Sequence, residues 1–226
     1  MSAQPDVLGV FKRGTQTFMG VELFAAEGAL VPREETEILG NEAAALLAKI
    51  PGEPRFIDLC TGSGNLACGI ASKVKNARGW AADLTEPCAA LAQKNVEKLG
   101  LSARVTVKRG DLLAPLDGEG LHGTIDMIVC NPPYISTGKL EKERADLLTT
   151  EPREAFDGGP YGLSIHQRVI KEALPYLKSG GYLMFEFGLG QERQMKALFD
   201  RGKAYRDLRF LNDAASAPRA CVAIKI

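Results

Sequence analysis

The hydrophobic and polar positions from residue 54 onward alternate between short apolar runs and longer repeats with helical spacing. The short runs have the length and the branched and aromatic residues of buried strands, whereas the longer segments place apolar residues three and four positions apart. Strands are expected at 55–60, 78–83, 104–108, 125–130 and 181–187, and helices at 65–73, 86–99 and 163–174. Strands separated by helices are typical of a mostly parallel sheet covered on both faces.

The two ends of the chain depart from this alternation. Residues 205–211 and 220–226 lie too close together for a helical crossover, so we expect an antiparallel hairpin at the C-terminal end. Residues 18–24 predict a strand or hairpin, and residues 34–50 predict a helix, but this stretch is too short for an independent domain. We therefore expect a single α/β domain at 54–226, with residues 1–53 packed on it as a cap near the mouth of the site.

The composition narrows the class of protein. The 226 residues are 45% hydrophobic and 25% charged, which suits a globular domain with one large core. Lysine and arginine number 28, as do aspartate and glutamate, so no net charge draws the chain toward nucleic acid or anionic lipid. Five cysteines without a Cys-x-x-Cys pair, together with the lack of a signal peptide or an apolar run of ~20 residues, favour a cytoplasmic protein without a metal site.

Residues 58–64, Asp-Leu-Cys-Thr-Gly-Ser-Gly, follow one expected strand and open a helix, where glycines let a ligand approach backbone amides at a positive helix end. Asp83 ends the next strand, near the spacing at which an acidic residue meets ribose hydroxyls in dinucleotide folds. Asp111 ends the third strand, where it either accepts from an adenine amino group or caps a turn. The third glycine of the dinucleotide fingerprint and a P-loop lysine are both absent, so a methyl-donating sulfonium nucleoside fits best.

The cofactor expected from this pattern is S-adenosyl-L-methionine, with S-adenosyl-L-homocysteine as its product. The residues predicted to bind it are Asp58, Thr61, Gly62, Gly64, Asp83, Leu84, Asp111, Leu112 and Asn131.

Residues 131–134, Asn-Pro-Pro-Tyr, follow the strand at 125–130 and therefore lie at a carboxyl end of the sheet, where ligands bind in open α/β folds. Two successive prolines remove two backbone donors, so the loop presents acceptors. The Asn131 side-chain oxygen and the Pro132 carbonyl can each accept one N–H of an amide or amine nitrogen and hold it in line with an electrophilic methyl group. Tyr134 can stack on a planar acceptor. We therefore predict Asn131, Pro132 and Tyr134 as catalytic residues; the alternative is a proline-rich turn whose Tyr134 only packs.

These segments resemble the release-factor glutamine methyltransferase family, also called HemK or PrmC, whose members methylate a side-chain amide nitrogen. The resemblance covers most of the chain and also includes residues 18–20, 30–37, 151–163 and 186–188. It implies the doubly wound, Rossmann-like sheet of class I methyltransferases. It also implies that Pro32 and Arg33 lie near the cofactor or substrate mouth as candidates for binding the acceptor, although Arg33 is equally compatible with a cap or salt bridge of the following acidic helix. Pro133 and Glu186 are further candidates for contacts with the acceptor, although Glu186 is equally compatible with a partner for a helix end.

The chain also departs from the family pattern. Only about seventeen residues precede residue 18, so the N-terminal helical domain by which the family usually recognises the release factor is not expected, and Glu34 replaces a proline. The expected acceptor is therefore a protein glutamine, such as that of a release factor, or a specialised peptide or small molecule. Two alternatives remain: an adenine-N6 methyltransferase of RNA or DNA, which the neutral charge disfavours, and a non-catalytic subunit that binds S-adenosyl-L-methionine, which the intact Asn-Pro-Pro-Tyr disfavours.

Overall fold

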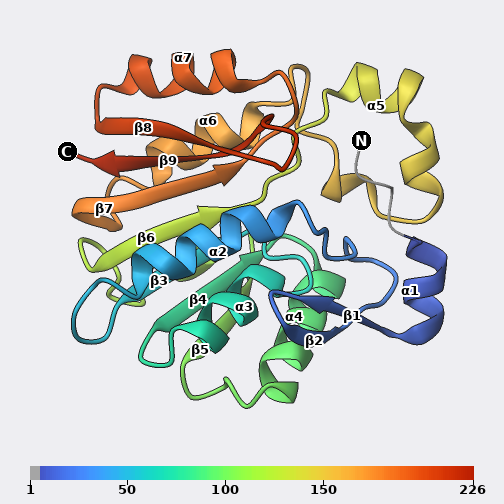
Figure 1. The fold of residues 1–226 in the computed structure, drawn as a ribbon, viewed down its shortest axis with the longest axis horizontal. Helices are drawn as coiled ribbons and strands as arrows, with labels where there is room; N and C mark the ends of the chain where they lie inside the picture. Colours follow the sequence, from blue (N-terminus) through green and yellow to red (C-terminus); the bar gives the residue numbers. More distant parts are fainter. Residues whose placement is uncertain (1–5) are drawn as a thin grey trace.

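The computed structural model describes residues 6–226, in which a seven-stranded sheet has the order β5-β4-β3-β6-β7-β9-β8. Five strands are parallel: β3 (Arg55–Leu59), β4 (Arg78–Asp83), β5 (Val105–Arg109), β6 (Ile125–Cys130) and β7 (Leu177–Glu186). The last two, β8 (Tyr205–Asn212) and β9 (Pro218–Lys225), pair antiparallel, and β9 also pairs antiparallel with β7 (Figure 1). The mostly parallel sheet with an antiparallel C-terminal hairpin is therefore confirmed.

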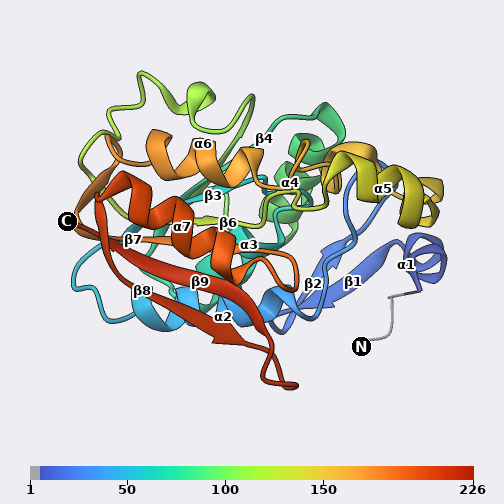
Figure 2. The same cartoon turned by 90° about the horizontal axis from the view of Figure 1, so that it is seen from above.

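Apolar residues on both faces of the central strands explain why these runs are almost continuously hydrophobic. Successive strand residues point to opposite faces, so Phe56 belongs to one core cluster and Ile57 to the other. The first cluster also takes residues of α2 (Thr36–Leu47), α3 (Asn65–Lys73) and α4 (Glu86–Lys98), whereas the second takes residues of α6 (Ser164–Glu172) and α7 (Glu192–Gly202). Helices thus cover both faces, as Figure 2 shows for α2 below the sheet and α6 and α7 above it.

The N-terminal part consists of α1 (Val7–Arg13), a hairpin of β1 (Thr15–Phe18) and β2 (Val21–Phe24), and then α2. Residues 1–5 of the predicted cap lie outside the described residues. The hairpin is fixed to α4 by Asn95, whose side-chain oxygen accepts from the Phe24 amide at 2.6 Å and whose nitrogen donates to the Phe24 carbonyl at 3.1 Å. This attachment holds the following segment, residues 25–35, beside the carboxyl edge of the sheet.

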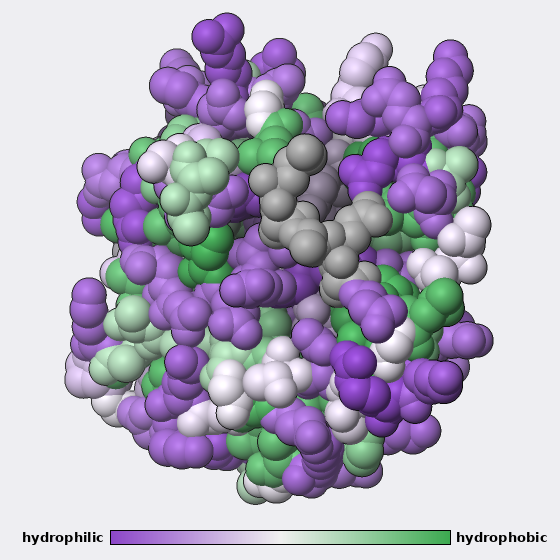
Figure 3. Space-filling view, turned by 45° about the vertical axis from the view of Figure 1, so that its right-hand side comes forward, coloured by the Kyte–Doolittle hydropathy of each residue, from purple (hydrophilic) through white to green (hydrophobic). Residues whose placement is uncertain are grey.

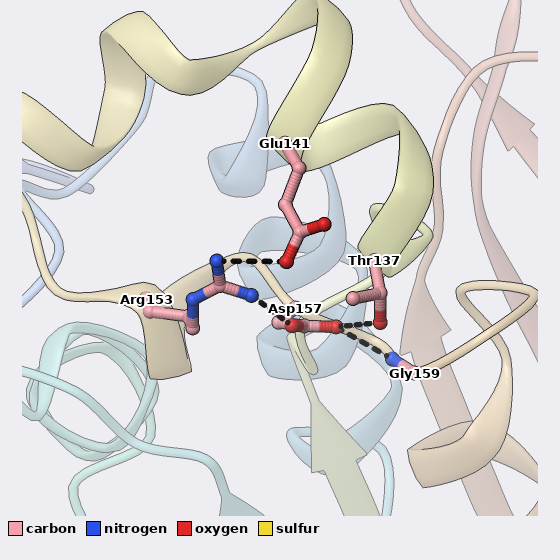
Figure 4. Close-up of polar contacts among 5 residues, drawn as sticks. All are labelled: Thr137, Glu141, Arg153, Asp157 and Gly159. Atoms are coloured by element: carbon pink, nitrogen blue, oxygen red, sulfur yellow. Dashed lines mark hydrogen bonds and ion pairs between the residues drawn. The ribbon is translucent and has the colours of Figure 1, made fainter.

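The segment between β6 and α6, for which the sequence pattern predicts no elements, contains α5 (Thr137–Glu143) and two short 3-10 helices, η2 (Ala145–Thr149) and η3 (Arg153–Ala155). Asp157 organises it by accepting from Thr137 at 2.7 Å, from Gly159 at 3.0 Å and from Arg153 at 2.9 Å, while Arg153 also reaches Glu141 at 3.2 Å (Figure 4). On the side of the molecule that carries α1 and α5, most visible side chains are hydrophilic (Figure 3). Polar contacts therefore contribute much of what holds this segment.

Across residues 6–226, none of the helices combines the length and the apolar character that crossing a bilayer requires.

Candidate active site

A pocket lies at the carboxyl ends of β3, β4 and β6, and residues 30–36 and 152–155 complete its wall. The sequence-predicted residues that line it are Thr61, Gly62, Asp83, Leu84, Asp111, Leu112, Asn131, Pro133, Pro32 and Arg33. The predicted residues outside its wall are Asp58, Gly64, Pro132, Tyr134 and Glu186. The fold thus brings the glycine turn and the Asn-Pro-Pro-Tyr loop to the same pocket, although they lie about 70 residues apart in the chain.

The turn between β3 and α3 is shaped from behind by Asp58. This carboxylate is fully buried, and its Oδ2 accepts from the Thr61 hydroxyl at 2.5 Å and from the Ala67 amide at 3.0 Å. Burial raises the pKa of Asp58 to about 7, and the two hydrogen bonds oppose this rise. Asp58 therefore supports the turn from beneath rather than forming part of the pocket wall.

The two glycines of the turn meet different surroundings. Gly64 has a φ of +79° and caps α3, and a Cβ there would lie 3.1 Å from the Cα of Ala92 in α4. Gly62 also has a positive φ, of +56°, but a Cβ there would meet nothing within 4 Å. Gly64 is thus required for close packing of the turn on α4, whereas Gly62 leaves open space at the pocket wall.

The carboxylates at the ends of β4 and β5 have different partners. Asp83 is nearly buried, and it accepts from the Gly62 amide at 2.9 Å and from the Thr85 amide at 3.0 Å. Asp111 is exposed, and both of its oxygens accept from the Arg168 guanidinium, at 3.0 and 2.9 Å. Asp83 is therefore hydrogen-bonded to the glycine turn, whereas Asp111 is bound by Arg168 of α6 at the rim of the pocket.

The Asn-Pro-Pro-Tyr loop is fixed at both of its ends. The Nδ2 of Asn131 donates to the Thr36 hydroxyl at 3.2 Å, and the Pro132 that follows is buried. The Tyr134 hydroxyl donates to Glu186 Oε1 at 3.3 Å, while the Tyr134 carbonyl accepts from Gln191 Nε2 at 3.0 Å. Burial, and then the charge of Glu186, raise the pKa of Tyr134. Tyr134 and Glu186 consequently lie behind the loop rather than on the pocket wall.

Glu186 is a buried carboxylate at the end of β7. Burial raises its pKa to about 7, and the nearby Thr36 hydroxyl and the charge of Arg219 oppose this rise. Its Oε1 accepts from Tyr134, whereas its Oε2 has no hydrogen-bond partner among the described residues. This carboxylate therefore faces the underside of the loop.

Sequence reasoning missed Glu151, which joins the two segments that complete the pocket wall. One of its oxygens accepts from the Val31 amide at 2.8 Å, and the other accepts from the Arg33 guanidinium, with both ionic side chains almost completely buried. The resemblance included residue 151 without giving it a role. We refer to the contacts of Glu151 with Val31 and Arg33 as the Glu151 clasp.

The histidines have structural surroundings. His166 is fully buried, its Nε2 lies 2.9 Å from the Glu186 carbonyl, and burial lowers its pKa to about 4. The ring of His122 contacts the ring of Tyr176 edge-on, with centroids 4.5 Å apart. Among residues 6–226, no three His, Cys, Asp or Glu side chains are grouped so that they could hold a metal ion.

Comparisons with known proteins match this chain to methyltransferases. A family model described as the methyltransferase small domain matches residues 38–159. A release factor glutamine methyltransferase of Moorella thermoacetica is 39% identical over 214 residues, which cover 94% of this chain and 73% of that protein. Its counterpart from Geobacter sulfurreducens is 37% identical over 188 residues, which cover 83% of this chain and 63% of that protein.

The fold has a counterpart among solved structures. A release-factor-specific protein-(glutamine-N5) methyltransferase from Alicyclobacillus acidocaldarius superposes with a TM-score of 0.52 at 21% identity, covering 100% of this chain and 99% of that chain. The present chain spans 63 to 73% of the length of the two curated relatives above.

Proposed function

Since the chain belongs to the release factor glutamine methyltransferase family, we propose that it transfers the methyl group of S-adenosyl-L-methionine to a glutamine side-chain nitrogen of a protein. The observation that carries this proposal is that one pocket contains Gly62, Asp83 and Asn131 in its wall. A release factor is the acceptor we propose, because it is the one that the relatives' names give.

The pocket residues fit a nucleoside cofactor. Two backbone amides occupy part of the acceptor capacity of Asp83, and an ionised carboxylate has about four lone-pair sites, so acceptors remain for ribose hydroxyls. Leu84 and Leu112 add apolar surface for a planar base, and Asp111 offers acceptors for its amino group. Gly62 leaves the space that a close ligand requires. When bound, S-adenosyl-L-methionine supplies an electrophilic methyl group on a positively charged sulfur.

The acceptor side of the pocket requires hydrogen-bond acceptors rather than a strong base. An amide nitrogen has a delocalised lone pair, so it reacts only when it is held in line with the methyl group. In our proposal the Asn131 Oδ1 and the Pro132 carbonyl each accept one N–H of the glutamine amide and stabilise the positive charge that develops there. The proton leaves after transfer, because methylation makes the nitrogen more acidic.

The proposal also includes a reducing compartment and a protein rather than a nucleic acid as the acceptor. The five cysteines are free thiols, which supports a reducing compartment such as the cytoplasm. Equal numbers of basic and acidic residues support a protein acceptor over a nucleic acid.

Methyl transfer from radiolabelled S-adenosyl-L-methionine tests the proposal. We expect label in a peptide-chain release factor, and none in a release factor whose acceptor glutamine is replaced or in total RNA. Asn131→Ala should lower turnover at least about 100-fold, while the Kd for S-adenosyl-L-homocysteine, measured by calorimetry, should change by less than about threefold. Asn41→Ala, on the exposed side of α2, is the matched control.

Each result has a distinct meaning. Labelled RNA would replace the protein acceptor with a nucleic acid. Binding of S-adenosyl-L-homocysteine without any transfer would favour the non-catalytic alternative. Near-normal turnover of Asn131→Ala would refute the role assigned to this amide.

A further inference from the structure

The Asn131 amide has two ends of nearly equal size and opposite hydrogen-bonding character. Its oxygen can accept from an amide nitrogen, whereas its NH2 group would confront the N–H bonds of that nitrogen with further donors. The amide has two orientations related by a flip, and turnover requires the one in which its oxygen faces the acceptor nitrogen. In the structure the Nδ2 end is already engaged, because it donates to the Thr36 hydroxyl at 3.2 Å.

Thr36 is well placed to select this orientation. It is the first residue of α2, its exposure is 1%, and it lines the pocket. A hydroxyl both donates and accepts, so Thr36 could by itself face either end of the amide. What decides its direction is the group on its other side.

That group is the buried carboxylate of Glu186. When ionised, a carboxylate only accepts hydrogen bonds. Glu186 Oε2 is buried without a hydrogen-bond partner among the described residues, and the nearby Thr36 hydroxyl lowers the pKa of this carboxylate. With the hydroxyl hydrogen directed at Glu186, the Thr36 oxygen presents a lone pair to Asn131 Nδ2. Arg219, whose side chain is 12% exposed, is the positive charge that acts on Glu186. Glu35 is the second acidic group nearby, and its Oε1 lies 3.7 Å from the guanidinium of Arg219.

The far end of the loop is fixed by contacts that Thr36 does not itself make. Tyr134 donates to Glu186 through its hydroxyl and accepts from Gln191 through its carbonyl. Gly162 packs against the same carbonyl, since a Cβ at position 162 would lie 2.3 Å from the Tyr134 oxygen. A change at Thr36 therefore affects the orientation of the Asn131 amide while these contacts of Tyr134 remain.

We propose that Thr36 is a positioning residue for methyl transfer: held by Glu186, its hydroxyl binds the Asn131 NH2 group and so turns the Asn131 oxygen toward the acceptor nitrogen. This inference rests on the proposed function and adds to it the residue that sets the orientation of the Asn131 side-chain amide.

Three variants test it at pH 8, where the Glu186 carboxylate is mainly ionised. Thr36→Val keeps the size of the side chain and removes the hydroxyl, whereas Thr36→Ser keeps the hydroxyl. Thr124→Val is the control for the same chemical change. Thr124 is half-buried, and its hydroxyl donates one hydrogen bond, to the Leu121 carbonyl at 2.9 Å, near the opposite end of β6.

The expected result separates turnover from binding. Thr36→Val should lower kcat about tenfold or more, with the KM for S-adenosyl-L-methionine and the Kd for S-adenosyl-L-homocysteine within about twofold of wild type. Thr36→Ser should restore kcat to within about threefold, and Thr124→Val should match wild type. Equal kcat values for Thr36→Val and Thr124→Val, or a Thr36→Ser protein as slow as Thr36→Val, would overturn the proposal.

Two further outcomes are decisive. If Thr36→Val does not fold, Thr36→Ala is measured in its place with the same expectation, and an unfolded Thr36→Ala would assign Thr36 to stability alone. A wild-type protein that methylates no acceptor overturns the proposed function, and with it the role of Thr36. A wild-type protein that methylates its acceptor while Thr36→Val equals the control overturns only the role of Thr36.

Discussion

At the scale of single residues, Asp58 illustrates how burial changes the behaviour of a carboxylate. Its pKa of about 7 lies well above its ordinary value of 3.8, mainly because the charged form is desolvated beneath the glycine turn. Between those two values the folded chain holds a proton at Asp58 that the unfolded chain has released. The free energy of unfolding therefore falls as pH rises through this window, and this contribution levels off above pH 7.

Asp58→Asn tests that behaviour. The variant cannot titrate at this position. As pH rises from 5 to 7, the unfolding free energy of wild type should therefore fall relative to that of Asp58→Asn, by up to about 1.4 kcal/mol per pH unit. Urea denaturation at pH 5, 6 and 7 measures this difference, with Asp200→Asn on the exposed part of α7 as the matched control. A wild-type to Asp58→Asn difference that stays constant over this range would contradict it.

The same scale shows where sequence reasoning stops. The glycine turn and the Asn-Pro-Pro-Tyr loop are short continuous segments that each follow a predicted parallel strand. Their position at the same edge of the sheet could therefore be predicted from the sequence. The partners Asn131 with Thr36 and Val31 with Glu151 lie 95 and 120 residues apart in the chain. A local pattern carries no signal for such pairs. For this reason Tyr134 was expected to contact the acceptor and Glu186 either the acceptor or a helix end, although the two side chains face each other behind the loop.

At the scale of elements, the central strands β3 and β6 were predicted well because each is an apolar run whose residues are buried on both faces of the sheet. The segment from 137 to 155 was not predicted, because side-chain bonds rather than hydrophobic periodicity fix its course. Asp157 and Arg153 hold it internally (Figure 4), and the Glu151 clasp ties it to the segment at 30–36. Two segments distant in sequence thus cover the pocket as one unit.

Glu151→Ala tests the importance of the clasp. The change leaves the Arg33 guanidinium, whose side chain is 12% exposed, and the Val31 amide without their partner. Loss of one member of a buried ion pair should lower the free energy of unfolding by about 3 kcal/mol and weaken binding of S-adenosyl-L-homocysteine, measured by urea denaturation and calorimetry. Glu141→Ala, which removes the partner of Arg153 in an exposed pair, is the control and should cost less than about 1 kcal/mol. Equal losses in the two variants would show that the clasp contributes no more than a surface contact.

At the scale of the whole molecule, we propose that the described N-terminal part, residues 6–53, unfolds together with the sheet. Helix α2 contributes Leu39, Ala43 and Leu47 to the same core cluster as Phe56 of β3 and Met184 of β7. The chain has a single tryptophan, Trp80 in β4, which belongs to the other cluster and reports on the sheet alone.

Leu39→Ala provides the test. Leu39 is fully buried, so its truncation should lower the free energy of unfolding by about 3 kcal/mol. If the chain is one cooperative unit, the urea midpoint from Trp80 fluorescence should fall by the same amount as the midpoint from far-ultraviolet circular dichroism. A circular dichroism signal that is lost first, with the Trp80 transition unchanged, would instead divide the chain into two units.

The position of β9 has a consequence for the order in which the site is assembled. Although β8 precedes it in the chain, β9 lies between β7 and β8 and carries Arg219, the positive charge that acts on Glu186. Arg219 therefore reaches its place beneath the acceptor loop only when β9 pairs with β7. Closure of the sheet and completion of the charge environment of Glu186 should consequently occur in the same folding step.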